Sequence, residues 1–419
     1  MGNRQDLIDA LNHKQPRRVP VDFGGTAVTG IHVLCMEGLR RHYGLQPGPV
    51  KVVEPYQMLG LMEQDLMDAM GVTVAGVMPS GNLFGFGNLP PYKPWRTPWG
   101  QDVLVPEGFI TVRDANGDEL IFPGGDPSAP PSGRMPAGGY FFDSIPRQQP
   151  FDEETLDYRD NLEEFGPVAE ADLTHLTREA ARLRALDAGA IGGLPGTALG
   201  DIAWVPGPNL KHPRGIRDVA EWYVSTVARP DYVHSIFEAQ TEIALKNLPK
   251  VYEALGDSVQ AVFVCGTDFG TQTSQFCSPR TFDSLYAPYY KRINGWIHAN
   301  TPWKTFKHSC GAIVPLLDHI IDAGFDIVNP VQCSAAGMEP EFLKREFGSR
   351  LVFWGGGVDT QRTLPFGTPE QVRAEALRRC EVFGRDGGFV FNAIHNVQAN
   401  TPVANVVAMV EAVKEFNGR

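Results

Sequence analysis

The 419-residue sequence has no apolar run approaching the roughly 20 residues that a helix needs to cross a bilayer. Its first fifteen residues, MGNRQDLIDALNHKQ, carry charges where a secretory signal peptide has an apolar segment. Both absences argue against a membrane or secreted protein. We therefore expect a cytoplasmic protein with no membrane partner.

Cysteine and basic residues are also in short supply. The six cysteines are widely spread, which fits reduced thiols better than a disulfide framework. Lys and Arg total 37 against 49 Asp and Glu, which gives a formal net charge of -12. Because nucleic-acid-binding proteins carry basic stripes, we expect a small-molecule substrate and no nucleic-acid partner. A homo-oligomer remains open, since the sequence does not fix the oligomeric state.

Common nucleotide-binding motifs are missing as well. The chain contains neither a GxGxxG fingerprint nor a Walker sequence. No motif therefore supports a nicotinamide cofactor or a nucleoside triphosphate.

Strand-like apolar segments, each followed by a turn and a helical pattern, recur along the chain. They are RVPVDF (18–23), VTVAGVM (72–78), AGAIGGL (188–194), QAVFVCG (260–266), KTFKH (304–308), FDIVNP (325–330), RLVFWGG (350–356) and GFVFNAI (388–394). Apolar strands that alternate with helices indicate an α/β protein whose parallel sheet is buried on both faces. A count of eight favours a closed (β/α)8 TIM barrel over an open sheet, so we predict one barrel domain over residues 1–419.

Three of the predicted helices have clear start signals. Ser278, Thr368 and Thr401 each place an N-cap hydroxyl directly before a proline at the first helical position. Thr368 and Gln371 also form a capping box. These signals predict helices that begin at three well-defined positions.

Residues 79–160 break the alternation of strands and helices. The segment is rich in Pro, Gly and aromatic residues, and TVRDANGDELIF within it predicts a β-hairpin that turns at Asn116 and Gly117. We expect an inserted subdomain. It either decorates the barrel or acts as a lid over the site.

Polar side chains gather where the predicted strands end, which is where barrel enzymes carry out their chemistry. The residues at these positions are Asp22, Gly192, Gly193, Asp268, His308, Cys310, Asn329, Asp359 and His395. We therefore expect a polar ring on an apolar scaffold.

The segment TFKHSCGAIVPLLDHIIDAG, residues 305–324, places two soft metal ligands at the end of a strand. His308 and Cys310 are one residue apart, so in a continuing strand their side chains point to the same side. Zinc binds imidazole and thiolate, and a catalytic zinc has three protein ligands and one open position. His395 is the expected third ligand, with Cys333 and Cys277 as competitors. A His-x-Cys pair is also compatible with ordinary packing.

Four segments of the chain resemble the uroporphyrinogen decarboxylase superfamily, whose members share a (β/α)8 barrel. They are GTDFGTQTSQFCSPRTFDSLYAPYYKRI, FKHSCGAIVPLLDHIIDAGFDIVNPVQ, FWGGGVDTQRTLPFGTPEQVRAEALRRC and FNAIHNVQANTPVANV. The superfamily contains porphyrin decarboxylases and zinc-dependent methyltransferases that work with corrinoid proteins. The decarboxylases carry an Arg-Gln-Ala-Gly-Arg-like segment after the first strand, where this chain reads VDFGGTAVTGIH without arginine.

The methyltransferase branch looks closer. Its members bind zinc through a His-x-Cys pair, which matches His308 and Cys310, and through a later Cys shortly before a Thr-Pro pair. Counting back from Thr401, His395 stands where that Cys belongs. An imidazole in place of a thiolate makes the metal a harder Lewis acid, which favours oxygen substrates.

The resemblance implies a zinc-dependent methyltransferase of the O-demethylase type. It would move a methyl group from a small methylated substrate to the Co(I) corrinoid of a partner protein. No Asp-x-His-x-x-Gly segment of the cobalamin-binding type occurs in the chain, so a separate corrinoid carrier protein is expected. The alternatives are methyl transfer from a methyl-corrinoid to a thiol, a metal-free lyase reaction like that of uroporphyrinogen decarboxylase, and a non-catalytic partner in a corrinoid complex.

Roles for the remaining site residues follow from this reading. Asp268 could orient a metal-ligating imidazole, accept a proton or act as a fourth ligand, and Asp359 is a second catalytic candidate. The expected substrate-binding residues are Asp22, Tyr140, Asn329 and Gln398. Tyr140 and its aromatic neighbours could close over an aromatic substrate or simply pack the insertion.

Overall fold

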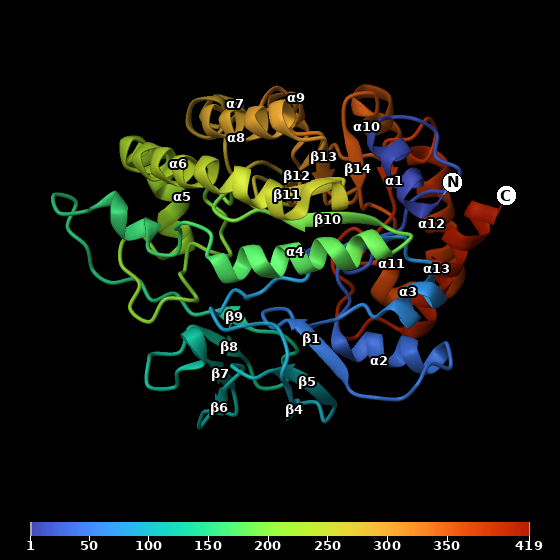
Figure 1. The fold of residues 1–419 in the computed structure, drawn as a ribbon, viewed down its shortest axis with the longest axis horizontal. Coiled ribbons are helices and arrows are strands. Elements are labelled where there is room, and N and C mark those ends of the chain that lie inside the picture. The colour runs from blue at the N-terminus through green and yellow to red at the C-terminus, as the bar shows by residue number, and fades with distance from the viewer. Residues whose placement is uncertain (1, 419) are drawn as a thin grey trace.

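Parallel strands run through the centre of the molecule in the computed structural model, which describes residues 2–418 (Figure 1). Seven of these strands form one sheet in the order β15-β14-β13-β12-β11-β10-β3. Their bounds are β3 (Val74–Gly76), β10 (Gly189–Gly193), β11 (Ala261–Cys265), β12 (Lys304–His308), β13 (Ile327–Asn329), β14 (Val352–Trp354) and β15 (Phe389–Val390). All seven lie within predicted strand segments.

Residues 20–22 close this sheet into a ring. Val21 forms a parallel bridge with Phe391, and Asp22 forms one with Val74. The N–H of Asp22 donates to the carbonyl of Phe391 at 2.9 Å, and the N–H of Val74 donates to the carbonyl of Val21 at 3.1 Å. The first predicted strand thus joins the two edges of the sheet, and the (β/α)8 barrel is confirmed.

Helices surround this ring. Their bounds are α1 (Asn3–Leu11), α2 (Val33–His42), α3 (Gln64–Met70), α4 (Glu170–Ala185), α5 (Val219–Ala228), α6 (Pro230–Leu255), α7 (Pro279–Thr281), α8 (Ala287–Asn300), α9 (Val314–Asp322), α10 (Pro340–Phe347), α11 (Thr363–Phe366), α12 (Pro369–Phe383) and α13 (Val403–Gly418). Ser278 caps α7, and Thr368 with Gln371 forms the predicted capping box of α12. Helix α13 begins directly after Thr401 and Pro402.

The inside of the barrel is a closed apolar layer. The side chains that form it are those of Val74, Ile191, Ala261, Phe306, Ile327, Val352, Trp354 and Val390, together with Leu7 and Leu11 of α1. Leu7 packs so closely on β10 that a Cβ added at Gly189 would lie 2.3 Å from it. Since α1 also contacts β3 and β15, it covers the amino-terminal end of the barrel. The end of the barrel at the carboxyl ends of its strands is therefore the end that can hold a functional site.

Two small sheets accompany the barrel and form the lower part of the molecule in Figure 1. One has the order β2-β1-β5-β4 and the other β6-β7-β8-β9. Their strands are β1 (Val50–Glu54), β2 (Leu59–Gly60), β4 (Tyr92–Arg96), β5 (Asp102–Pro106), β6 (Thr111–Arg113), β7 (Glu119–Ile121), β8 (Gly133–Met135) and β9 (Asp143–Ser144). The antiparallel pair β6 and β7 is the predicted hairpin. The first sheet, which we call the β1–β5 sheet, also uses two strands that precede residue 79.

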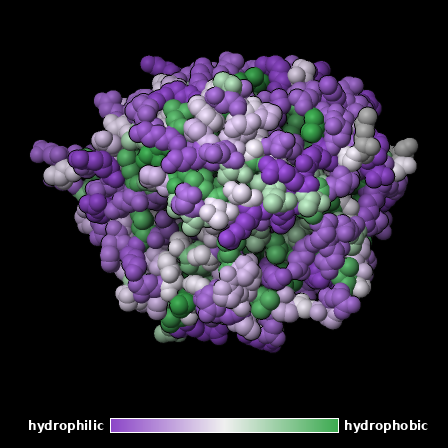
Figure 2. All heavy atoms as spheres, in the orientation of Figure 1, coloured by the Kyte–Doolittle hydropathy of each residue, from purple (hydrophilic) through white to green (hydrophobic). Residues whose placement is uncertain are grey.

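The surface carries no extended apolar band on the face in Figure 2, where hydrophobic residues are scattered among hydrophilic ones. Between residues 2 and 418, no helix combines the length and apolar character that a membrane span requires.

Candidate metal centre

His308 is the last residue of β12 and lies in the layer above the apolar interior of the barrel. Phe306, two residues earlier, belongs to that interior, and side chains two residues apart on a strand point to the same side. The imidazole is almost fully buried. The strand thus directs it toward the carboxyl-terminal mouth.

Asn329, at the end of the neighbouring strand β13, fixes the His308 ring. Its Nδ2 donates to the carbonyl of Trp354 at 2.8 Å, so its Oδ1 faces Nδ1 of His308 at 2.6 Å. Since Oδ1 can only accept, Nδ1 carries the ring proton. Nε2 of His308 is therefore left with a free lone pair, as a metal ligand needs.

Cys310 follows on a loop that is held against the loop after β11. Gly311 has a φ of +90°, and a Cβ there would lie 2.4 Å from the backbone of Gly270, so only glycine permits this approach. The N–H of Cys310 donates to Oδ1 of Asp268 at 2.7 Å. The same carboxylate oxygen lies 3.8 Å from Nε2 of His308. Asp268 is thus next to both predicted ligands.

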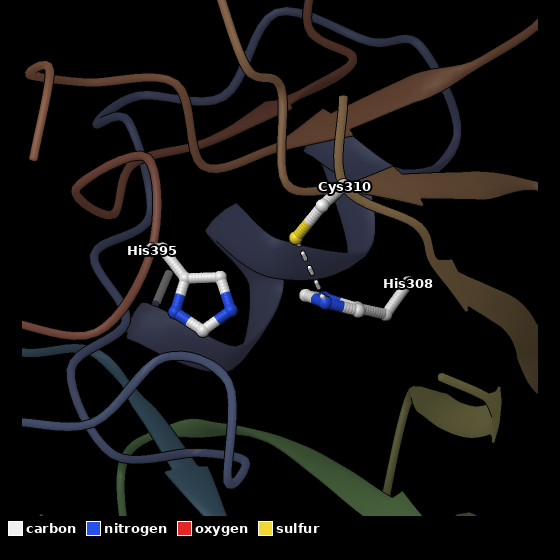
Figure 3. A group of neighbouring side chains, drawn as sticks. All are labelled: His308, Cys310 and His395. Atoms are coloured by element: carbon white, nitrogen blue, oxygen red, sulfur yellow. Dashed lines mark hydrogen bonds between the residues drawn. The ribbon is translucent and has the colours of Figure 1, made fainter. Parts of the chain in front are cut away.

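His395 lies on the loop after β15, across the mouth from His308. The N–H of Asn396 donates to its Nδ1 at 2.8 Å. In the neutral ring this contact assigns the proton to Nε2, so a metal bound at Nε2 requires the other tautomer. Figure 3 shows the His395 ring facing Cys310 and His308.

The three side chains come close enough to share one ion. One ligating atom from each of His308, Cys310 and His395 lies within 4.8 Å of the other two. Sγ of Cys310 is 3.6 Å from Nε2 of His308, and the two imidazole centroids are 5.3 Å apart. Two donors on a tetrahedral zinc are separated by about 3.5 Å, given bond lengths of about 2.0 to 2.3 Å. The donor set and its spacing therefore fit a zinc ion.

Burial sets the protonation of these groups. It lowers the pKa of His308 to about 4, and together with the neighbouring His308 it lowers the pKa of His395 to about 4. Burial also raises the pKa of the Cys310 thiol well above its ordinary value, and Asp268 adds to this effect. Both imidazoles are thus neutral near pH 7, and without a metal the thiol keeps its proton.

Sequence reasoning missed Lys307, which points away from the barrel interior and is fully buried. Its Nζ donates to the carbonyls of Thr267 and His308 and lies 4.8 Å from the centre of the Phe269 ring. Burial lowers its pKa, while nearby thiols and carboxyls, Asp201 among them, raise it. A strand pattern alone does not reveal such a lysine, because its Nζ bonds to backbone carbonyls, one at the end of its own strand and one on the loop after β11.

The other predicted site residues bond to segments outside this cluster. Asp22 is fully buried in the barrel, where Oδ2 accepts from Nε1 of Trp354 and Oδ1 from the N–H of Gly25, both at 2.8 Å. Asp359 accepts from the N–H of Gln361 at 2.7 Å, and its own N–H donates to Glu375.

Tyr140 and Gln398 make contacts near α2. The carbonyl of Tyr140 bonds to Nε2 of His32, and the carbonyl of Gln398 accepts from Sγ of Cys35. The side chain of Gln398 is exposed. Cys333, a competitor for the third ligand position, bonds to the carbonyl of Val331 and is not part of the cluster.

Known proteins resemble both the sequence and the fold. The sequence model of the family described as uroporphyrinogen decarboxylase matches residues 212–416. A uroporphyrinogen decarboxylase from Coxiella burnetii is 24% identical over 189 residues, which are 45% of this chain and 49% of that protein. One from Chlorobium luteolum is 30% identical over 125 residues, 29% of this chain and 33% of that protein. The chain thus spans at most about half the length of these relatives.

A solved structure, a methyltransferase from Methanosarcina mazei, shares the fold. It aligns over 99% of both chains with a TM-score of 0.55 at 17% sequence identity. At this identity the likeness concerns the architecture, and it includes the regions outside residues 212–416.

Proposed function

We propose that this protein is a zinc-dependent methyltransferase of the O-demethylase type. It takes a methyl group from a small methylated oxygen compound and passes it to the Co(I) corrinoid of a carrier protein. The match of residues 212–416 to the family described as uroporphyrinogen decarboxylase supports the superfamily that the sequence predicted. The observation that carries this proposal is the convergence of His308, Cys310 and His395 at the mouth of the barrel. The likeness of the fold to that of the methyltransferase from Methanosarcina mazei supports it.

The zinc ion would be held by Nε2 of His308, Sγ of Cys310 and a ring nitrogen of His395. When bound, it supplies Lewis-acid polarisation of the heteroatom that leaves the methyl group. With one thiolate and two neutral imidazoles, this centre is less electron-rich than one with two thiolates, which favours an oxygen leaving group. Asn329 keeps His308 in the tautomer that leaves Nε2 open.

The remaining residues act on the substrate and on its proton. Breaking the C–O bond leaves the electron pair on oxygen, the two electrons of Co(I) form the new bond to carbon, and the oxygen takes up a proton. Asp268 is the acidic group next to the ligands, with 23% of its side chain exposed, and we assign it to this proton. Phe263 and Val28 are only partly buried and pack on the apolar interior below, so they offer an apolar contact for the substrate.

The test combines metal analysis with a transfer assay. We expect about one zinc per chain and methyl transfer from methoxylated donors to a Co(I) corrinoid carrier protein. Cys310→Ala and His395→Ala should lose both zinc and activity. Cys333→Ala removes a partly buried thiol outside the cluster and should keep both. Methyl transfer from a methyl-corrinoid carrier to a thiol, with no transfer from methoxylated donors, would instead favour the thiol methyltransferase.

The names of the sequence relatives favour a second candidate, decarboxylation of a porphyrin-type substrate. Such a substrate carries several carboxylates, which arginines normally clamp. The segment after the first strand, residues 21–32, contains no arginine. Zinc-independent release of CO2 from uroporphyrinogen would establish this candidate and refute demethylation.

A further inference from the structure

Asn396, the residue after the candidate ligand His395, is completely buried and makes a network of side-chain hydrogen bonds. Its Oδ1 accepts from the N–H of Gly30 at 2.6 Å. Its Nδ2 donates to the carbonyl of Ala27 at 2.9 Å and to Oε1 of Gln57 at 2.8 Å. Every polar atom of this amide therefore bonds to a segment that lies far away in the sequence.

The partners of Asn396 belong to two different parts of the fold. Gly30 and Ala27 lie on the loop that follows the first barrel segment. Gln57 lies in the turn between β1 and β2, and its Nε2 donates to the carbonyl of Ala27 at 3.2 Å. The Glu54 carboxylate orders that turn, because its two oxygens accept from the N–H groups of Tyr56 and Gln57. The turn between β1 and β2 therefore presents Gln57 to Asn396 in a fixed position.

Backbone contacts continue the connection on the far side of Asn396. The N–H of Val397 donates to the carbonyl of Gly30 at 3.0 Å, and the N–H of His32 donates to the carbonyl of Val397 at 2.9 Å. Nε2 of His32 in turn bonds to the carbonyl of Tyr140. A continuous set of hydrogen bonds therefore links the His395 loop to the β1–β5 sheet and to the insertion.

We infer that Asn396 is a positioning residue for His395, and that Gln57 makes the third metal ligand depend on the β1–β5 sheet. The inference rests on the metal site proposed above. His308 is held by the side chain of Asn329 on a neighbouring barrel strand. The His395 loop is held by backbone hydrogen bonds from Ile394 and Val397 to other loops of the barrel, and by the side chain of Asn396. Without the Asn396 side chain, that loop loses its side-chain hydrogen bonds to Gly30, Ala27 and Gln57 and keeps only backbone hydrogen bonds to its neighbours. The site would then keep His308 and Cys310 but hold His395 loosely.

The experiment measures the affinity of the full-length protein for Zn²⁺ and Co²⁺. Loss of a residue that orients a ligand weakens binding by about 10- to 100-fold, and we expect this for Asn396→Ala. Gln57→Ala should weaken binding less, because only one of the three hydrogen bonds of the Asn396 side chain is lost. Gln57→Glu keeps an oxygen for Nδ2 of Asn396 but loses the donor to the carbonyl of Ala27, so its affinity should lie between those of wild type and Gln57→Ala. In the Co²⁺ form of Asn396→Ala the thiolate charge-transfer band should remain, while the d–d bands change as the imidazole is lost.

Two controls separate positioning from general destabilisation. Asn247 is also buried, with Oδ1 accepting from the N–H of Val168 and Nδ2 donating to the carbonyl of Gly166. Asn247→Ala should leave metal affinity unchanged. In a His395→Ala background, Asn396→Ala should have no further effect, because the ligand it positions is already gone.

Several outcomes would overturn the inference. One is a Zn²⁺ affinity of Asn396→Ala equal to that of wild type. Another is that Asn396→Ala lowers the Zn²⁺ affinity equally in the wild-type and in the His395→Ala background. If Asn396→Ala does not fold, Gln57→Ala and Gln57→Glu test the inference. Equal Zn²⁺ affinities of these two variants would refute the link between the β1–β5 sheet and His395. A wild-type protein that binds zinc but transfers no methyl group refutes the proposed function and leaves this inference standing. A wild-type protein that binds no metal refutes both.

Discussion

Oδ1 of Asn329 lies 2.6 Å from Nδ1 of His308, and this contact determines which nitrogen of the imidazole is available to a metal. Replacing Asn329 by Leu keeps the approximate volume and removes the acceptor. Affinity for zinc should fall by about 10- to 100-fold, because the ring can then rotate or adopt the other tautomer. Asn329→Asp keeps the acceptor and should bind zinc within a few-fold of wild type. Equal affinities of the Leu and Asp variants would refute this role.

Zinc binding should release about one proton per chain at pH 7, and Cys310 should be its source. The pKa of the thiol is raised, so the metal must displace its proton, whereas both histidines have a pKa of about 4 and are already neutral. Titration calorimetry in buffers with different ionisation enthalpies measures the number released. If the histidines also lost protons, the number of protons released per zinc would increase strongly from pH 7 to pH 6.

Trp354→Phe should reduce the free energy of unfolding by about 1–3 kcal/mol, because it removes the donor to Oδ2 of the fully buried Asp22. Burial raises the pKa of Asp22 to about 6, above its unfolded value. The folded state therefore holds the proton of the Asp22 carboxyl more tightly than the unfolded state. The stability that comes from this protonation is lost as the pH rises through the folded pKa. Losing the Trp354 donor raises that pKa further.

The destabilisation by Trp354→Phe should accordingly be larger at pH 8 than at pH 5, as urea unfolding can determine. Trp303→Phe is the comparison, since Trp303 is equally buried but donates to the carbonyl of Gly256 rather than to a carboxylate. A pH-independent difference for both variants would contradict the role assigned to Asp22.

Asp268→Asn should retain zinc yet lose about 10²-fold in the rate of demethylation. The amide can still accept the N–H of Cys310, so the loop should keep its shape. The group that handles the proton of the leaving oxygen, however, is gone. Metal content and single-turnover rates on the same preparation separate these two effects.

Asp359→Asn is the matched comparison for Asp268, because the sequence suggested both as catalytic. Its carboxylate accepts from the N–H of Gln361 within its own loop, and we expect a much smaller change in rate. A loss as large as that of Asp268→Asn would give Asp359 a part in the reaction.

Much of the fold could be predicted because its signals are local. A short apolar run predicts each strand of the barrel, and Thr368 with Gln371 marks the start of α12 within four residues. The recruitment of β1 and β2 into a sheet with β4 and β5 could not be predicted in this way. It depends on pairing between β1 and β5, segments about fifty residues apart in the sequence, for which the local pattern is short and mixed.

The sequence by itself determined that two imidazoles and a thiol follow strands of one parallel barrel, and hence that they lie at the same end. Only the tertiary structure decided that their ligating atoms lie within 4.8 Å of one another, because that distance depends on the closure of the ring by residues 20–22. It also decided the partners of Asn329, Lys307 and Asn396. Hydrogen bonds are directional and short-ranged, so the residues that satisfy a buried polar group are known only once the chain segments around it are in place.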